Sequence, residues 1–192
     1  MACRDLSLAY DVMSDEPRPL MDTRRAAPRG TNRWLPPPPG LCKINVDAGV
    51  ARSGAGGAFA AICRDEAGCY LGASAITIPE MTDPPTLEAM ACNEGLSLAM
   101  DLNISRFCVA SDCLAVVKSL LANEFGHYSV ITKEIGVRKE LFEEVVFKHE
   151  NRYFNFDAHN LAKAASPLSF GRRVWLLDVP DIACIPLRAR VE

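Results

Sequence analysis

The order of apolar segments is the feature that most limits what this chain can fold into. Three apolar runs come first, over residues 41–48, 54–64 and 69–78. Residues 65–68, between the second and third runs, are Asp, Glu, Ala and Gly, a composition typical of a tight turn. Helical spacing then alternates with short apolar runs. A hairpin followed by such an alternation predicts an α/β fold, in which helices pack against a mixed sheet.

The second half of the chain supplies the elements of that alternation. Asp83 precedes two prolines, which are tolerated in the first turn of a helix, and is the expected cap of the first helix. Pro167 is expected to end the last one. Between these residues we predict, in order, a helix over 84–102, a strand over 107–110, helices over 114–121 and 130–141, a strand over 145–148 and a helix over 155–165.

Three acidic residues stand at positions where a charged group is costly. Asp47 lies inside an apolar run, Glu88 opens the first helical stretch, and Asp112 ends the apolar run that begins at Phe107. A carboxylate at the end of a buried strand loses hydration energy unless it is paired or binds a metal. The three residues, in a strand, a helix and a strand, therefore predict one shared cation site.

Each of these acids also has a simpler interpretation when it is taken alone. Asp112 follows a strand and can cap the next helix. Glu88 lies in a first helical turn, where a negative charge interacts favourably with the helix dipole. Asp47 can be a turn residue at a strand end. These separate roles are the alternatives to a shared site.

Composition and charge exclude several classes of protein. The 192 residues carry a formal net charge of −3, which argues against a protein that holds nucleic acid by bulk charge alone. No apolar stretch reaches 18 residues, so we expect no membrane span. The first ten residues do not read as a signal peptide, and we expect an intracellular protein, of the nucleus or the cytoplasm. The eight cysteines include no C-x-x-C pair, which argues against a zinc site and favours reduced thiols.

We expect one folded domain between two terminal segments. Residues 1–33 are polar and lack periodicity, which predicts a disordered leader. Trp34 and a run of four prolines follow, so that 1–40 form the leader and an extended proline-rich linker. The domain is expected over 41–166, as a monomer, and 167–192 as a C-terminal tail.

Several short motifs occur in a fixed order. They are Trp34 with its prolines, Lys43 to Asp47 (KINVD), Gly56-Gly57, Ile62 to Asp65 (ICRD) before Gly68, Glu88-Ala89 with Gly95-Leu96, Ser111-Asp112, and finally His149, Arg152, Asn155, Ala158-His159 and Leu161 to Lys163. With this ordered set, over about residues 34–165, the chain resembles the ribonuclease H-like domains of plant retroelement polyproteins and of their stand-alone relatives.

The resemblance implies an RNase H-like fold, with a five-stranded mixed sheet of three antiparallel and then two parallel strands, flanked by helices. It also implies metal-dependent cleavage of the RNA strand of an RNA–DNA hybrid. The family carboxylates match Asp47, Glu88 and Asp112, which would be catalytic and bind two Mg²⁺ ions. The matching nucleic-acid contacts would come from Gly56, Gly57, Arg152 and Asn155, with Lys163 as a further phosphate contact.

Position 159 departs from the family pattern. A fourth acidic residue usually comes from the last helix, four residues after the match to Asn155, and here it is His159. Neutral imidazole suits Mn²⁺ better than Mg²⁺, so we expect weaker metal binding, a preference for Mn²⁺ and slower turnover; alternatively, His159 shuttles a proton. Asp157 points elsewhere on the helix and cannot replace it. A domain that binds nucleic acid or a protein partner without cleaving is the alternative function.

Overall fold

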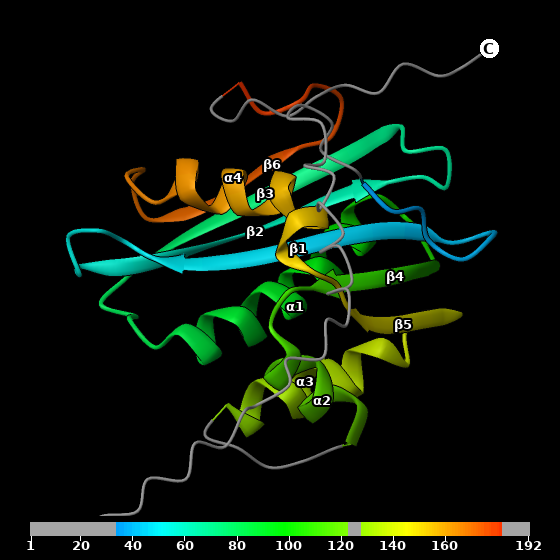
Figure 1. Cartoon of the computed structure of the whole chain (residues 1–192), viewed down its shortest axis with the longest axis horizontal. Coiled ribbons are helices and arrows are strands. Elements are labelled where there is room, and N and C mark those ends of the chain that lie inside the picture. Colours follow the sequence, from blue (N-terminus) through cyan, green and yellow to red (C-terminus); the bar gives the residue numbers. More distant parts are fainter. Residues whose placement is uncertain (1–33, 123–127, 182–192) are drawn as a thin grey trace, which may run out of the picture. The chain divides into compact units, whose positions relative to one another are not determined.

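The structure of the chain is a computed structural model that describes residues 34–122 and 128–181 (Figure 1). Its centre is a mixed sheet of six strands in the order β5-β4-β1-β2-β3-β6. The strands are β1 Cys42–Val50, β2 Gly56–Arg64, β3 Tyr70–Pro79, β4 Arg106–Ser111, β5 Glu144–His149 and β6 Gly171–Trp175. The pairs β1–β2, β2–β3 and β3–β6 are antiparallel, and the pairs β1–β4 and β4–β5 are parallel.

Four α-helices of the described part of the chain cover the two faces of the sheet. They are α1 Pro84–Asp101, α2 Leu114–Ala122, α3 Ser129–Lys139 and α4 Phe156–Ala165, with a short 3₁₀ helix, η1 Arg152–Phe154, before α4. Figure 1 shows α1, α2 and α3 below the sheet and α4 above it. The fold class and the order of the predicted elements are therefore confirmed. None of these described helices is long and apolar enough to cross a membrane.

The sheet has one strand more than predicted. β6 pairs antiparallel with β3, with Arg172 opposite Ile76, and it lies in the segment 167–192 that was expected to be a tail. Because only five residues form this strand, and two of them are arginines, no apolar alternation marks it in the sequence. Residues 1–33, predicted to be a disordered leader, lie outside the described residues.

β2 is buried on both faces and divides the core into two parts. Its alternate side chains belong to separate clusters, with Phe59, Ala61 and Cys63 packed with residues of α1, and Ala58, Ala60 and Ile62 packed with Leu161, Ala162 and Ala165 of α4. Alanine dominates the second cluster, so the backbone of α4 can approach the sheet closely. This approach brings α4 within reach of the side chains that β1 presents on the same face.

Helix α1 is fixed against the sheet by its cap and by a close contact with a glycine. The Asp83 carboxylate accepts a hydrogen bond from the Thr86 backbone N–H at 3.0 Å, which confirms the predicted cap. A Cβ on Gly57 would lie 2.4 Å from Leu87 Cδ1, so a side chain there would displace the buried side chain of Leu87 on α1. Glu88 follows Leu87 and is therefore held at the surface of the sheet.

Arg172 links the additional strand to α1. Its Nε donates to Glu94 Oε1 at 2.9 Å, and its Nη2 donates to Asp101 Oδ2 at 2.5 Å. Glu94 is only 4% exposed, so its charge depends on this guanidinium. The ion pair therefore joins β6, at the edge of the sheet, to the helix that carries Glu88.

Replacing Arg172 with Ala should lower the free energy of unfolding by about 1–3 kcal/mol, because the substitution removes the cation bonded to buried Glu94. Arg173→Ala is the matched control, since Arg173 donates to the backbone oxygen and the hydroxyl of exposed Ser169. Chemical denaturation of the two variants measures the difference. Equal losses of stability would contradict the role given to the Glu94 pair.

Candidate metal centre

Three carboxylates from three elements meet where β1 and β4 part. The parallel pairing of these strands ends at Val46 and Ser111, and Asp47 and Asp112 are the next residues. Glu88 reaches the same point from the start of α1. One oxygen of each carboxylate lies within 4.8 Å of the other two. The structure thus brings together the three acids that the sequence analysis grouped, here named the carboxylate cluster.

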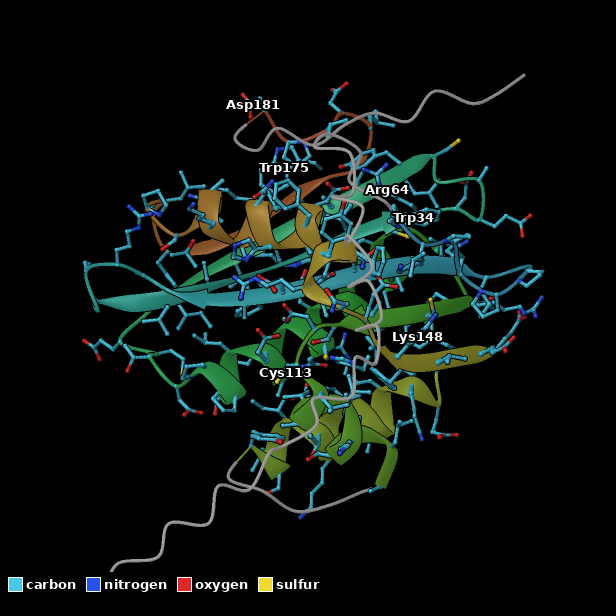
Figure 2. The ribbon with its side chains drawn as sticks, viewed as in Figure 1. Trp34, Arg64, Cys113, Lys148, Trp175 and Asp181 are labelled. Atoms are coloured by element: carbon cyan, nitrogen blue, oxygen red, sulfur yellow. The ribbon has the colours of Figure 1, made fainter. Side chains whose placement is uncertain are left out.

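Ser111 and Asp112, at the end of β4, divide between them the capping role and the cluster role that the sequence analysis left open for Asp112. Its hydroxyl accepts the backbone N–H of Cys113 at 3.1 Å, at the start of α2 (Cys113 is labelled in Figure 2). The same hydroxyl donates to Glu88 Oε2 at 3.5 Å. The Asp112 carboxylate instead lies with those of Asp47 and Glu88, within 4.8 Å of each. Ser111 therefore binds the backbone N–H of the residue before α2, and Asp112 belongs to the carboxylate cluster.

Burial and mutual repulsion disfavour negative charge in the cluster. Asp47 is 3% exposed, and burial, followed by the charges of Glu88 and Asp112, raises its pKa to about 9. Burial, followed by the charge of Asp112, raises the pKa of Glu88 to about 8, although hydrogen bonds from the Ala48 backbone and Ser111 oppose the shift. The cluster therefore retains protons at neutral pH unless a cation neutralises it.

His159 approaches the cluster from α4. Its Nδ1 lies 3.0 Å from Asp47 Oδ2. Arg152 Nη2 lies 3.2 Å from both ring nitrogens of His159. In the plane of the ring, a position at equal distance from the two nitrogens is blocked by the Cε1–H group. The guanidinium therefore lies over the face of the ring. Burial, followed by the charge of Arg152, lowers the pKa of His159. The contact with Asp47 is therefore a hydrogen bond of a neutral imidazole rather than an ion pair.

A buried polar network supports the strand that carries Asp47. Lys43 Nζ donates to both carboxylate oxygens of Glu150, at 2.6 and 2.5 Å. Asn45 Nδ2 donates to Glu150 Oε2 at 3.0 Å and to Asn155 Oδ1 at 2.8 Å. Because side chains alternate along a strand, Lys43, Asn45 and Asp47 all lie on the α4 face of β1.

The same network ties α4 and the linker to β1. Asn155, the residue before α4, donates from Nδ2 to the carbonyl of Val46 at 2.8 Å. Trp34, labelled in Figure 2, donates its indole N–H to Asn45 Oδ1 at 3.2 Å, and its ring centre lies 5.3 Å from Lys43 Nζ. The end of the linker and the start of α4 are thus both bonded to β1.

A second buried ion pair sets the rotation of α4 about its axis. Arg64 Nη2 donates to Asp157 Oδ2 at 3.0 Å, and Arg64 is 1% exposed. Asp157 therefore points to β2 and away from the carboxylate cluster, as the helical spacing predicts. His159, two residues further along, faces Asp47 instead.

The residues predicted to contact nucleic acid have different environments. Asn155 is fully buried with both ends of its amide bonded to protein atoms, an environment that suits a positioning role, and its direct contact with nucleic acid stays a prediction. Gly56 and Gly57 are buried in β2, and a Cβ on Gly56 would lie 2.3 Å from the Ile78 carbonyl oxygen, so packing accounts for the glycine. Arg152 is exposed, and its charge opposes the rise in the pKa values of the cluster.

Sequence reasoning missed Lys43 and Glu150 as a buried pair. Lys43, Asn45 and Asp47 alternate with apolar residues, so one face of β1 is polar along its length. Such a face is normally solvated in an antiparallel sheet, and the alternation alone does not indicate burial. Glu150 follows β5 in a polar segment of the sequence. Its contact with Lys43 of β1 depends on how the strands are ordered in the sheet, so the sequence alone does not show it.

Comparison with known proteins agrees with this architecture. The model of the reverse transcriptase-like family matches residues 45–165. Among solved structures, RNase H1 of the archaeon Halobacterium salinarum is 20% identical with a TM-score of 0.57, and the match covers 66% of this chain and 97% of that one. No curated protein was found to match significantly.

Two further solved structures have the same fold. The N-terminal RNase H domain of a Mycobacterium tuberculosis protein is 18% identical with a TM-score of 0.59, covering 65% of this chain and 92% of that one. LC11-RNase H1, isolated from compost and solved in complex with an RNA/DNA hybrid, is 23% identical with a TM-score of 0.54, covering 62% of this chain and 92% of that one. The chain therefore has an RNase H-like fold, with one more strand than predicted.

The raised pKa values should make the stability of the metal-free protein depend on pH. Between the ordinary carboxyl pKa of about 4 and the folded-state values, the folded protein binds more protons than the unfolded chain. The stability that Asp47 and Glu88 contribute by retaining protons is complete below about pH 4 and is lost as the pH rises towards 8 and 9. In EDTA, the free energy of unfolding should therefore decline from about pH 5 to about pH 8 more steeply than in the Asp47→Asn variant.

Urea denaturation across this range measures the decline. Asp178→Asn is the control, because Asp178 is exposed and lies outside the carboxylate cluster. A wild-type decline that Asp47→Asn leaves unchanged would show that the cluster does not retain its protons.

Proposed function

This chain belongs to the reverse transcriptase-like family, and we propose that it is a ribonuclease that hydrolyses the RNA strand of RNA–DNA hybrids. The observation that carries the proposal is the convergence of Asp47, Glu88 and Asp112 at one strand edge. Without a cation this arrangement is costly, since burial and repulsion raise the pKa of Asp47 to about 9. A bound divalent cation would offset that cost.

The donor set fits two Mg²⁺ or Mn²⁺ ions. Carboxylate oxygens suit both metals, and Mg²⁺ usually keeps several of its waters, so the protein need supply only a few ligands. Asp47, the most buried of the three, would hold the ions together with Glu88 and Asp112. When bound, two such ions would activate a water molecule and stabilise the leaving oxygen of the phosphodiester.

The chain's own residues would keep this geometry rigid. The bonds of Lys43 and Asn45 to Glu150 hold β1 in place, and Asn155 fixes the start of α4 to the same strand. His159 is neutral at pH 7 and faces Asp47, so its imidazole can hold the ion that Asp47 binds or accept a proton from water. Rigid supports of this kind favour a precise site over one built on loops.

The proposed substrate class is that of one of the compared structures. LC11-RNase H1 was solved with an RNA/DNA hybrid, and we extend this substrate to the present chain. The protein would recognise the hybrid by its shape and by 2′-hydroxyl contacts, without base specificity. Because the net charge is −3, local cations such as exposed Arg152 and Lys163 would meet the phosphates. The plant retroelement origin implied by the sequence stays a prediction.

His159 favours a second function, binding of the hybrid without cleavage. The imidazole supplies no negative charge where the family usually has an acid, so the second ion would be held less tightly. Hybrid-cleavage assays with Mg²⁺ and then with Mn²⁺ separate the two functions. Retained hybrid binding without cleavage in either metal would identify the chain as a binding module.

Loss of a residue that only hydrogen-bonds to a metal ligand usually lowers activity about 10- to 100-fold. Asp47→Asn changes a proposed ligand itself, so it should reduce hybrid cleavage by more than about 100-fold. The fold should survive, since the amide keeps the shape of the side chain and can still bond His159. Initial rates on a labelled hybrid measure the effect, with Asp178→Asn as the control at an exposed site. Cleavage that survives in the Asp47→Asn variant would refute the assignment.

His159→Asp should raise the Mg²⁺-dependent rate by about tenfold and reduce the ratio of the Mn²⁺ rate to the Mg²⁺ rate. The added carboxylate supplies the hard oxygen ligand that Mg²⁺ prefers. His159→Asn is the matched control, because it removes the imidazole without adding charge. A Mg²⁺-dependent rate that is unchanged or lower in the Asp variant would mean that the histidine is not a defect.

A further inference from the structure

Trp34 fixes the orientation of the Asn45 side-chain amide. The half-buried indole donates its Nε1–H to Asn45 Oδ1 at 3.2 Å. Because an indole N–H can only donate, it decides which end of this amide is the oxygen. The other end, Asn45 Nδ2, then faces two acceptors, Glu150 Oε2 at 3.0 Å and Asn155 Oδ1 at 2.8 Å. A reversed amide would bring two donors together at Trp34 and oxygen against oxygen at both acceptors.

The orientation of Asn45 passes through Asn155 to the place where β1 and α4 meet. Because Asn155 Oδ1 accepts from Asn45, the other end of its amide is directed to the carbonyl of Val46, at 2.8 Å. Val46 is the residue before Asp47. The backbone oxygen of Asn155 accepts the N–H of His159 at 3.2 Å. Asn155 therefore fixes both the backbone beside Asp47 and the helical turn that carries His159, whose Nδ1 lies 3.0 Å from Asp47 Oδ2.

Lys43 keeps Trp34 and the end of the linker in place. Its Nζ donates to the Leu35 carbonyl at 2.8 Å and to both carboxylate oxygens of Glu150, so each of its three N–H groups has an acceptor. The same ammonium group lies 5.3 Å from the centre of the Trp34 ring. Lys43 is 1% exposed, so loss of the Leu35 carbonyl would leave a buried donor without its partner. Residues 34 and 35 thus complete the buried network.

We propose that Trp34 is a positioning residue for the carboxylate cluster, and that it sets the contact between Asp47 and His159 through two asparagine side chains. The inference rests on the proposed function, because Asp47 would be a metal ligand there. The family model matches residues 45–165, so the match assigns no role to Trp34. A change that removes the indole N–H would let the Asn45 amide turn, and the alignment of β1 with α4 would become less precise.

Trp34→Phe tests this role, because it removes the indole N–H and keeps a flat ring over Lys43. In two-dimensional NMR of the metal-free protein in EDTA, the variant should show changed signals for the side-chain amide of Asn155 and for the backbone N–H of His159. Trp175→Phe is the matched control, since Trp175 is the other tryptophan of the chain and lies on β6, with β2 and β3 between it and β1 (Figure 2). The control should leave both signals as they are in the wild type.

Calorimetry with Mn²⁺ then measures the effect on the cluster. Trp34→Phe should weaken Mn²⁺ binding about threefold to tenfold, a smaller loss than for a direct partner of a metal ligand, because Trp34 acts through two further side chains. In the Asn155→Ala variant the chain of hydrogen bonds is already broken, so adding Trp34→Phe should weaken binding no further. Losses of affinity that simply add would contradict coupling through Asn155.

The two measurements separate this inference from the proposed function. Unchanged Asn155 and His159 signals in Trp34→Phe, with Mn²⁺ bound as tightly as by the wild type, would refute the positioning role alone. Changed signals in a chain that binds no Mn²⁺ and cleaves no hybrid would refute the proposed function alone.

Discussion

The electrostatic cost of gathering three carboxylates at one strand edge is the constraint on which the account depends. Asp47, Glu88 and Asp112 come from elements far apart in the sequence, yet their oxygens lie within 4.8 Å of one another. Burial and repulsion disfavour their charges, so the fold has to hold them by other interactions. Proteins usually tolerate such strain where a site is functional, because a ligand of opposite charge restores the balance.

The interactions that hold the cluster are themselves buried and polar. The Lys43–Glu150 pair is almost fully buried and lies under the linker, whose Leu35 carbonyl also accepts from Lys43. Asn45 and Asn155 extend it to α4. Burying any one of these polar groups alone would be energetically costly, but each forms hydrogen bonds with the others. The complete network therefore specifies one arrangement of β1 and α4. These supports therefore fix the strand that carries Asp47 and the start of the helix that carries His159.

The sequence predicted the fold class and the order of elements because hydrophobic periodicity and turn residues are local signals. It also grouped Asp47, Glu88 and Asp112, since a charge inside an apolar run stands out without any structure. It could not predict β6, which is held by pairing with β3 and by Arg172, nor the burial of Glu150, which depends on contacts far apart in sequence.

The central claim, that the cluster is a divalent-cation site, is tested most directly by calorimetry. Metal-free protein at about pH 7 is titrated with Mn²⁺ in two buffers of different ionisation enthalpy. The account predicts saturable binding whose apparent heat differs between the buffers, because binding displaces protons from Asp47 and Glu88. Absence of binding, or equal binding by a variant with Asn or Gln at positions 47, 88 and 112, would contradict it.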